Sequence, residues 1–275
     1  MKFSEIKDKI QNLGELKSLA EIKAAGLRVV RNSKTGDYWL IEKEFLKPVL
    51  KSPQELKKYK FGSESLKKRV VLCNMQPTEI EESKLAQYFH WGESINTHKN
   101  STCAQRAIWW KLPYEEGNLF WVKEIRKRIA VFRSDTKLLA DNRLYTSTTY
   151  TDVFLSSNST ITAFIAEVTK RDLGGGGGPR SMMVYEVQDQ LIPTPALFEN
   201  ESIDFGKRTV QDIFEECGVN PSKPIRSQDP RPLTDRKALD DIVFDALELT
   251  EEERKEVYWA VCELVKNRLD KAKSV

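Results

Sequence analysis

Apolar residues in this chain occur in short runs separated by charged or turn-forming segments, and this pattern limits the folds open to it. Short runs rich in β-branched and aromatic residues are typical of buried strands. Such runs are Leu27–Val30, Tyr38–Ile41, Arg69–Asn74, Leu119–Val122, Ile129–Phe132, Leu144–Ser147 and Met183–Val187. The first two flank Asn32–Asp37, whose composition favours a turn, so they predict a hairpin. No run approaches the roughly 18–20 apolar residues of a membrane span, and we expect no transmembrane helix.

Other segments have the residue spacing of helices. They are residues 79–91, 153–155 with Asp152 as a possible cap, 161–168, 210–217 and 239–247. Thr250 and Glu253 have the spacing of a capping box, in which each side chain bonds to the other residue's backbone amide, and a helix should follow to about Lys271. Strands mixed with helices predict an α+β fold. We expect a mixed-sheet domain over residues 1–200 and a helical C-terminal region over residues 201–275.

The aromatic and cysteine content indicates a folded protein in a reducing compartment. Six Trp, eight Tyr and twelve Phe are enough to build a core. The cysteines at 73, 103, 217 and 262 are too widely spaced for a CxxC pair or a dense disulfide framework. With only two histidines beside them, we expect no structural metal site. The charged N-terminus has no apolar stretch typical of a secretory signal, so the expected location is cytoplasmic.

Charge is distributed unevenly along the chain. Residues 1–180 hold 31 Lys and Arg against 21 Asp and Glu, whereas residues 181–275 hold 13 against 20. A basic first part joined to an acidic last part suggests that one part faces a polyanion. Solvated surface charge explains the same asymmetry, and both interpretations stay open.

Motifs for catalysis and cofactor binding are missing from the sequence. No Pro-Pro dipeptide, Walker-type phosphate loop or Gly-x-Ser-x-Gly is present. The five glycines Gly174–Gly178 lead directly to a predicted strand, so they indicate a flexible or close-approach loop, with a ligand cradle as the alternative. Glu82-Ser83-Lys84 has the local order of a nuclease motif, but no Pro-Asp pair precedes it. We therefore assign no catalytic residue, metal ligand or cofactor site to this chain.

A first group of candidate DNA-binding residues combines a cation with large flat rings. Arg106 precedes Trp109 and Trp110. Arginine can read a guanine edge with two hydrogen bonds, and an aromatic ring can stack on an extruded or terminal base. The alternative is that both tryptophans belong to the core, because large aromatic side chains dominate core burial.

A second group is rich in cations. Lys123, Arg126, Arg128 and Arg133, together with Lys127, lie within eleven residues that contain one acid, Glu124. On neighbouring strands they could form a stripe against a phosphate backbone, although a solvated sheet edge would have the same composition.

Asn142 and Arg143 pair an adenine-type reader with a guanine-type reader. Asp141-Asn142 is also good turn chemistry, so this pair alone decides little.

The order of motifs resembles the target recognition region of adenine-N6 DNA methyltransferases of the TaqI-like kind, including fused restriction–modification enzymes. The resemblance covers the chain from about residue 13 to its end. It rests on the collinear stretches Glu44–Pro53, Trp91–Glu93, Cys103–Trp110, Phe120–Lys123, Ala140–Tyr145, Leu155–Ser159, the glycine run with Val184–Val187, Leu191–Pro195, Leu239–Ile242 and Leu249–Glu253. The resemblance adds Lys47, Lys51, Gly176 and Arg180, which follows the glycine run, to the expected DNA-binding residues.

This resemblance implies sequence-specific recognition of double-stranded DNA for a separate catalytic domain that flips and methylates an adenine. S-adenosylmethionine would be bound by that catalytic partner, because its motifs are missing here. The chain would then be a fragment, a separately encoded specificity subunit or a remnant. A metal-dependent DNA endonuclease and a non-catalytic protein-interaction subunit are the alternative functions.

Overall fold

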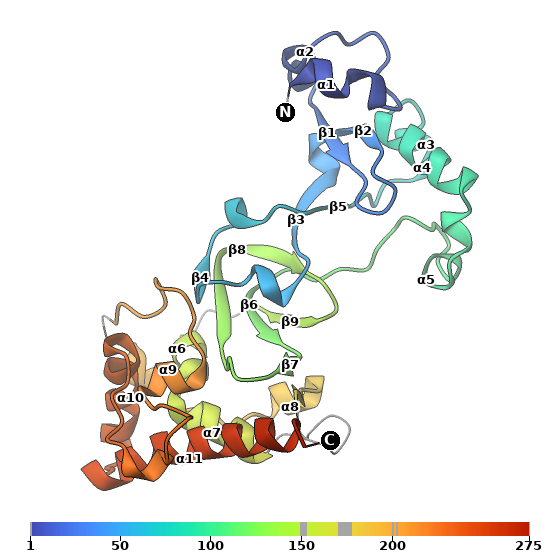
Figure 1. Cartoon of the computed structure of the whole chain (residues 1–275). Coiled ribbons are helices and arrows are strands. Elements are labelled where there is room, and N and C mark those ends of the chain that lie inside the picture. Colours follow the sequence, from blue (N-terminus) through green and yellow to red (C-terminus); the bar gives the residue numbers. More distant parts are fainter. Residues whose placement is uncertain (1, 149–152, 170–177, 200, 202, 275) are drawn as a thin grey trace. The chain divides into compact units, whose positions relative to one another are not determined.

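The computed structural model describes residues 2–148, 153–169, 178–199, 201 and 203–274. The chain forms two compact units (Figure 1). Unit 1 comprises Met1–Val49 and Lys68–Tyr114, and unit 2 comprises Leu50–Lys67 and Glu115–Val275. Residues on both sides of the boundary expected at residue 200 belong to unit 2. The division into a recognition domain and a helical region stays a prediction. No helix in the described ranges has the length and apolar character needed to cross a membrane.

Unit 1 is built from short helices and two pairs of antiparallel strands. Its elements are α1 (Phe3–Ile6), α2 (Leu19–Ala24), β1 (Leu27–Arg31), β2 (Tyr38–Glu42), β3 (Leu46–Leu50), β5 (Arg69–Val71), α3 (Pro77–Ile80), α4 (Lys84–Ser94) and α5 (Ser101–Ala104). Strand β1 pairs with β2, and β3 pairs with β5. The predicted hairpin is confirmed. Asn32 Oδ1 closes its turn by accepting from the amides of Lys34 and Thr35, and Gly36 takes a positive φ of 87°.

Ser83 and Lys84 of the tripeptide Glu82-Ser83-Lys84, which has the order of a nuclease motif, lie at the start of α4. The Ser83 hydroxyl accepts from the Ala86 amide, which makes Ser83 the N-cap of the helix. The Glu42 carboxylate accepts from the amides of Lys84 and Leu85 at 2.7 and 3.0 Å. Lys84 Nζ in turn donates to the Asn12 carbonyl at 2.6 Å. Ser83 and Lys84 therefore have a structural explanation.

Unit 2 combines a mixed sheet with helices. Its elements are β4 (Lys60–Phe61), β6 (Gly117–Val122), β7 (Glu124–Ile125), β8 (Val131–Ala140), β9 (Leu144–Ser147), α6 (Val153–Asn158), α7 (Thr160–Thr169), β10 (Arg180–Ser181), α8 (Val184–Gln188), α9 (Ile213–Cys217), α10 (Thr234–Ala246) and α11 (Glu251–Lys271). Strand β6 lies between β8 and β9 and is antiparallel to both, while β4 joins β8 in parallel. The α+β fold class with its mixed sheet and helical C-terminal region is confirmed.

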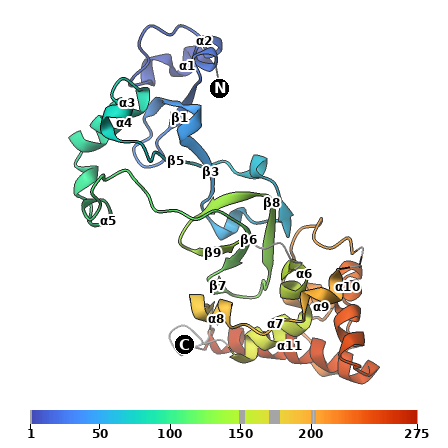
Figure 2. The same cartoon turned by 180° about the vertical axis from the view of Figure 1, so that it is seen from behind.

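The C-terminal helices share their core with the sheet. Leu239 and Val243 of α10 belong to the same buried cluster as Phe120 and Phe132 of the strands. A second buried cluster joins α7, α9, α10 and α11, and Figure 2 shows α7 running alongside α11. Helix α10 therefore packs on the sheet within unit 2, and α9 and α11 join it through the second cluster.

One predicted strand is wrong, and the helix predicted over residues 79–91 is divided between α3 and α4. The sequence predicts a strand over Met183–Val187, but Val184–Gln188 is the helix α8. The Glu186 carboxylate accepts from the Met183 amide at 2.8 Å, which stabilises the first turn of the helix. A short apolar run fits a strand and a helix equally well by periodicity, so local capping decided between them. Asp152 and Gly174–Gly177 lie outside the described residues.

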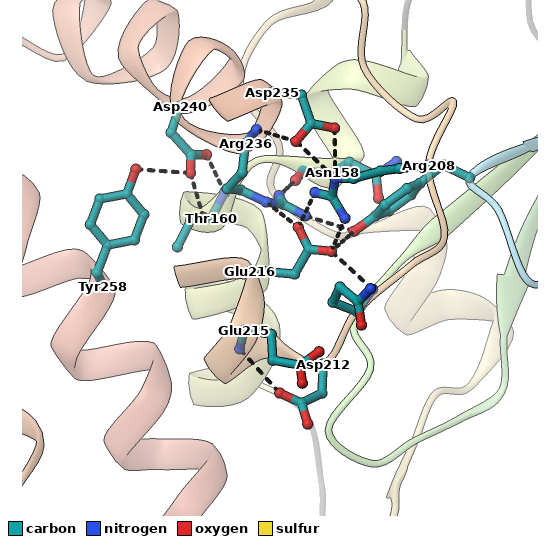
Figure 3. Close-up of polar contacts among 12 residues, drawn as sticks. Asn158, Thr160, Arg208, Asp212, Glu215, Glu216, Asp235, Arg236, Asp240 and Tyr258 are labelled. Atoms are coloured by element: carbon teal, nitrogen blue, oxygen red, sulfur yellow. Dashed lines mark hydrogen bonds and ion pairs between the residues drawn. The ribbon is translucent and has the colours of Figure 1, made fainter. Parts of the chain in front are cut away.

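A buried polar network joins α9 and α10 to Tyr59, which precedes β4, and to Asn158 at the end of α6 (Figure 3). The guanidinium of Arg236 donates to Glu216, to the Tyr59 hydroxyl and to the Asn158 carbonyl. Glu216 is only 2% exposed and also accepts from Arg208 through both of its oxygens. Buried charges are tolerated only when they are paired and hydrogen-bonded, and each of these groups has partners. This network ties Arg208, in the segment before α9, to Glu216 of α9 and through it to Arg236 of α10.

Candidate nucleic-acid interface

A cavity of about 600 Å³ in unit 2 is lined by most of the cations of the basic stretch 123–133. We call it the cationic pocket. It is lined by Ser52, Pro53, Gln54, Val122, Lys123, Glu124, Arg126, Lys127, Arg128, Phe132, Asn142 and Arg143. Five predicted DNA-binding residues are thereby brought together from two separate stretches. The glutamate is the single acidic side chain in this lining.

Strand pairing explains why the two stretches meet. Val122 at the end of β6 pairs with Leu144 at the start of β9. The next residue, Lys123, donates its amide to the Arg143 carbonyl at 3.2 Å. The first residue of the basic stretch and the last of the Asn-Arg pair must therefore be neighbours, because both lie at the same end of one antiparallel pair.

The Asp141 carboxylate organises one wall of the pocket. It accepts from Arg143 Nε at 3.0 Å and from Lys51 Nζ at 2.5 Å, and Arg143 Nη2 also donates to the Lys51 carbonyl at 2.6 Å. Burial alone would raise the pKa of Asp141, but the hydrogen bonds from Lys51 and Arg143 outweigh it and lower this pKa. The side chains of Lys51 and Arg143 remain 57% and 56% exposed. Asn142 is exposed and lies in the turn that joins Asp141 to Arg143.

The other cations of the pocket differ in how freely they can meet a ligand. Lys123 Nζ lies 4.4 Å from the centre of the Tyr145 ring, within range of a cation–π interaction. Arg128 donates to the Pro53 carbonyl at 3.2 Å, and burial lowers the pKa of its guanidinium. Arg126 is exposed. Lys127 forms an ion pair with Asp212 at 2.8 Å, and the hydrogen bond to this carboxylate raises the pKa of the lysine.

Two further candidates lie on β8 and β3. Arg133 is exposed on β8, where it pairs with Leu119 of β6 and with Lys60 of β4. Lys47 is exposed on β3 in unit 1, opposite Val70. Neither lines the cationic pocket, and their contact with DNA stays a prediction.

Arg106, Trp109 and Trp110 lie together in unit 1. The Trp110 ring stacks on Phe89 at 4.5 Å between ring centres, with 14° between the planes. Trp109 Nε1 donates to Glu93 at 3.0 Å, and Arg106 donates to the Trp109 carbonyl at 3.2 Å. Both tryptophans are half-buried against a hydrophobic cluster. This packing favours the core alternative for the rings, and stacking on a base stays a prediction.

The last two candidates come from the glycine-rich region. Arg180 Nε donates to Glu167 at 3.0 Å, and its side chain is 13% exposed, so the guanidinium is engaged within the fold. Gly176 lies outside the described residues.

Sequence patterns did not indicate that Ser52 and Gln54 would line the pocket, because neither carries a charge. Pairing of Arg143 with Asp141 was an open alternative in the sequence, but the bond from Lys51 to Asp141 was hidden, since these two residues are distant in the sequence. Among the described residues, no three His, Cys, Asp or Glu side chains group in a way that could hold a metal ion.

Comparison with known proteins identifies the class. Residues 29–209 match the family of the C-terminal domain of the type II methyltransferase M.Eco57I. The match covers more than half of the chain, so the chain belongs to this family. The resemblance drawn from the motif order, to a target recognition region of restriction–modification enzymes, is thereby confirmed.

A solved structure supports the same fold. The chain is similar to the crystal structure of the type IIG restriction endonuclease BpuSI, with a TM-score of 0.52 and 12% sequence identity. The similarity covers 90% of this chain and 31% of that one, so the chain spans about a third of the length of BpuSI. No curated protein matches the sequence.

Proposed function

We propose that this chain recognises a specific double-stranded DNA sequence for an adenine-N6 methyltransferase or restriction–modification enzyme. The observation that carries the proposal is the convergence of Lys123, Arg126, Arg128, Asn142 and Arg143 on one pocket. The chemistry of each of these side chains suits DNA, and they come from two stretches that the sequence keeps apart. Family membership supports the same role.

The chemistry of the pocket divides into two tasks. Lys123 and Arg126 suit phosphate oxygens, which attract any accessible cation and carry no sequence information. Asn142 and Arg143 suit base edges, because an amide can bond adenine and a guanidinium can bond guanine through two contacts each. Asp141 holds the turn that carries them, so their backbone positions are set before DNA arrives. Preorganisation of this kind lowers the entropy cost of binding.

The proposed partner is a catalytic methyltransferase domain or subunit that binds S-adenosylmethionine. The support is that the chain spans 31% of the solved structure it resembles and carries no recognisable cofactor motif. The cofactor would supply the methyl group there, while the residues of this chain would bind and orient the duplex. Location in the cytoplasm follows as part of the same proposal.

Salt-dependent binding tests the phosphate contacts. Binding of a labelled duplex is measured by fluorescence anisotropy at several salt concentrations. The double variant Lys123→Gln/Arg126→Gln should lower the slope of log affinity against log salt by about 1.8, from about 0.9 per neutralised phosphate contact. The control is Lys207→Gln/Lys273→Gln, which removes the same charge from exposed lysines elsewhere in unit 2. Equal slopes for both double variants would remove the pocket from the interface.

Binding-site selection tests base readout. Replacing Asn142 or Arg143 with Ala should weaken the selected site by about 1–3 kcal/mol and relax the preference at one base pair. Binding to unrelated duplexes should change much less. Equal losses on all sequences would show that these side chains only position the protein.

Plasmid cleavage separates the endonuclease alternative from the proposal. The full chain is incubated with plasmid and Mg²⁺ or Mn²⁺. Metal-dependent cleavage that Glu82→Ala abolishes would favour the endonuclease and count against a purely recognitive role.

A further inference from the structure

The loop that carries most cations of the pocket is held from the C-terminal side of the chain. We call residues 123–128 the cationic loop. The Met182 amide donates to the Lys123 carbonyl at 2.7 Å, and the Ile213 amide donates to the Lys127 carbonyl at 2.9 Å. Within the loop, β7 contributes only two residues of regular pairing, with β10. The loop therefore depends on partners that are distant in the sequence.

The third of these partners is a buried side chain near the end of α11. Arg268 Nη2 donates to the Arg126 carbonyl at 2.6 Å, and the same guanidinium donates to the Gly178 carbonyl. It also forms two hydrogen bonds with the Glu167 carboxylate, at 3.1 and 2.8 Å, and both of these side chains are 2% exposed. One guanidinium thus connects α11 and α7 with the loop. The planar fork of arginine suits this task, because its five donors have fixed directions.

A second connection runs through the N-terminus of α9. Asp212 Oδ1 accepts from the amides of Phe214 and Glu215 at 3.1 and 3.2 Å and so caps this helix; the bond to Glu215 is visible in Figure 3. Its other oxygen pairs with Lys127 Nζ at 2.8 Å. The loop is therefore fastened at Arg126 by a side chain of α11 and at Lys127 by the start of α9.

We infer that Arg268 is a positioning residue, which holds the cationic loop in the shape that binds DNA; this inference rests on the proposed function. Arg268 itself is buried, and its guanidinium is engaged within the fold. It acts through its hydrogen bond to the Arg126 carbonyl. This bond holds the backbone at Arg126 and so sets the point from which the exposed Arg126 side chain extends. The C-terminal helical region then helps to shape the DNA interface, in addition to any docking to a catalytic partner.

The expected effect of losing Arg268 is on binding by the folded protein. A loop that must be ordered at each binding event costs affinity, because conformational entropy is lost on association. We expect Arg268→Gln to weaken duplex binding about tenfold. The slope of log affinity against log salt should fall by about 0.9, which corresponds to the loss of one phosphate contact. Arg268→Lys keeps the charge beside Glu167 but cannot reach all acceptors at once, and it should show the same changes in milder form.

The experiment uses the full chain and two readouts. Duplex binding is measured against salt, and native-state amide hydrogen exchange is followed over residues 123–129 without DNA. The matched control is Arg254→Gln, because Arg254 lies on the same helix and also donates to a backbone carbonyl and a carboxylate. Urea denaturation of each variant shows how much is folded at the conditions of the assay.

The inference expects faster exchange in the cationic loop and weaker binding for both Arg268 variants, and neither change for the control. If Arg268 had only a structural role, replacing it would lower the free energy of unfolding, while the folded variant would keep the exchange rates and the salt slope of the unaltered chain. That result would overturn the inference. If the unaltered chain itself shows no salt-dependent DNA binding, the proposed function fails, and hydrogen exchange still decides whether Arg268 holds the loop.

Discussion

Replacing Glu216 with Gln should be among the most destabilising single changes in unit 2. The Glu216 carboxylate is 2% exposed and is the shared acceptor for Arg208 and Arg236. It also accepts from the Tyr59 hydroxyl at 3.0 Å and from the Gln211 amide at 3.1 Å. Glutamine has nearly the same shape, so the change removes charge and acceptors without opening a cavity.

The magnitude follows from the hydrogen bonds that the substitution removes. A glutamine side chain has one oxygen and one NH₂ group, and at this position the NH₂ group would face donors whichever way the amide is turned. In place of Glu216 Oε2 it would meet Arg208 Nη2 and Arg236 Nε, which now donate at 2.6 and 3.2 Å. Each hydrogen bond to a charged group contributes about 1.5–3 kcal/mol. Breaking a buried ion pair on one side costs about 3–5 kcal/mol, and we expect a loss of stability in this range.

The pH dependence gives a second signature of the same group. Burial alone would raise the pKa of Glu216, but the hydrogen bonds from Arg208 and the charge of Arg236 outweigh it, so this pKa is lowered. A carboxyl whose pKa is lower in the folded chain stabilises the fold above its unfolded pKa, about 4.3 for glutamate. This contribution is lost as the pH falls through the folded pKa. Below about pH 4.3 the unaltered chain should therefore lose more stability than Glu216→Gln does.

The assay must report on unit 2 separately, because the chain has two compact units. Amide hydrogen exchange of α9 and α10 at increasing urea concentration meets this need. The control is Glu215→Gln on the same helix, where the side chain is exposed and the expected change is within about 0.5 kcal/mol. A loss below about 1 kcal/mol for Glu216→Gln would refute the reasoning, because it would mean that the buried arginines need no anionic partner.

Three other predictions concern a helix cap, an ion pair and a close contact. Thr250→Ala should cost about 0.5–2 kcal/mol in urea denaturation, since the Thr250 hydroxyl caps α11. Asp212→Asn should keep the cap of α9 and the bond from the Ile213 amide to the Lys127 carbonyl, which still holds the loop, but should release the Lys127 side chain. The salt slope of DNA binding should then rise by up to about 0.9, and an unchanged slope would keep Lys127 out of the interface. Gly117→Ala should destabilise the sheet by about 1–3 kcal/mol in the same denaturation assay, because a Cβ there would lie 2.6 Å from the Ser147 carbonyl oxygen.

Features set by neighbours in the chain could be predicted from the sequence. The hairpin around Asn32–Asp37 and the capping box at Thr250 depend on side chains and amides two to three residues apart, and both are present. The mixture of strand and helix patterns was sufficient for the α+β class. The helix at Val184–Gln188 was missed for a related reason, because a five-residue run is too short for periodicity to separate helix from strand.

The candidate site was only partly visible in the sequence. Residue chemistry selected Lys123, Arg126 and Arg143, but their meeting in one pocket follows from the pairing of β6 with β9. Charge alone also could not separate Lys127, which Asp212 neutralises, from the exposed Arg126.

The sequence by itself determined the hairpin, the capping box and the chemical types available for binding. The tertiary structure alone decided which cations share a surface, which are engaged within the fold, and that Arg268 reaches the cationic loop. The physical reason is that the energy of a charge depends on its burial and on the distances to its partners. Those distances are set by strand pairing and helix packing between segments far apart in the chain, and sequence spacing does not contain them.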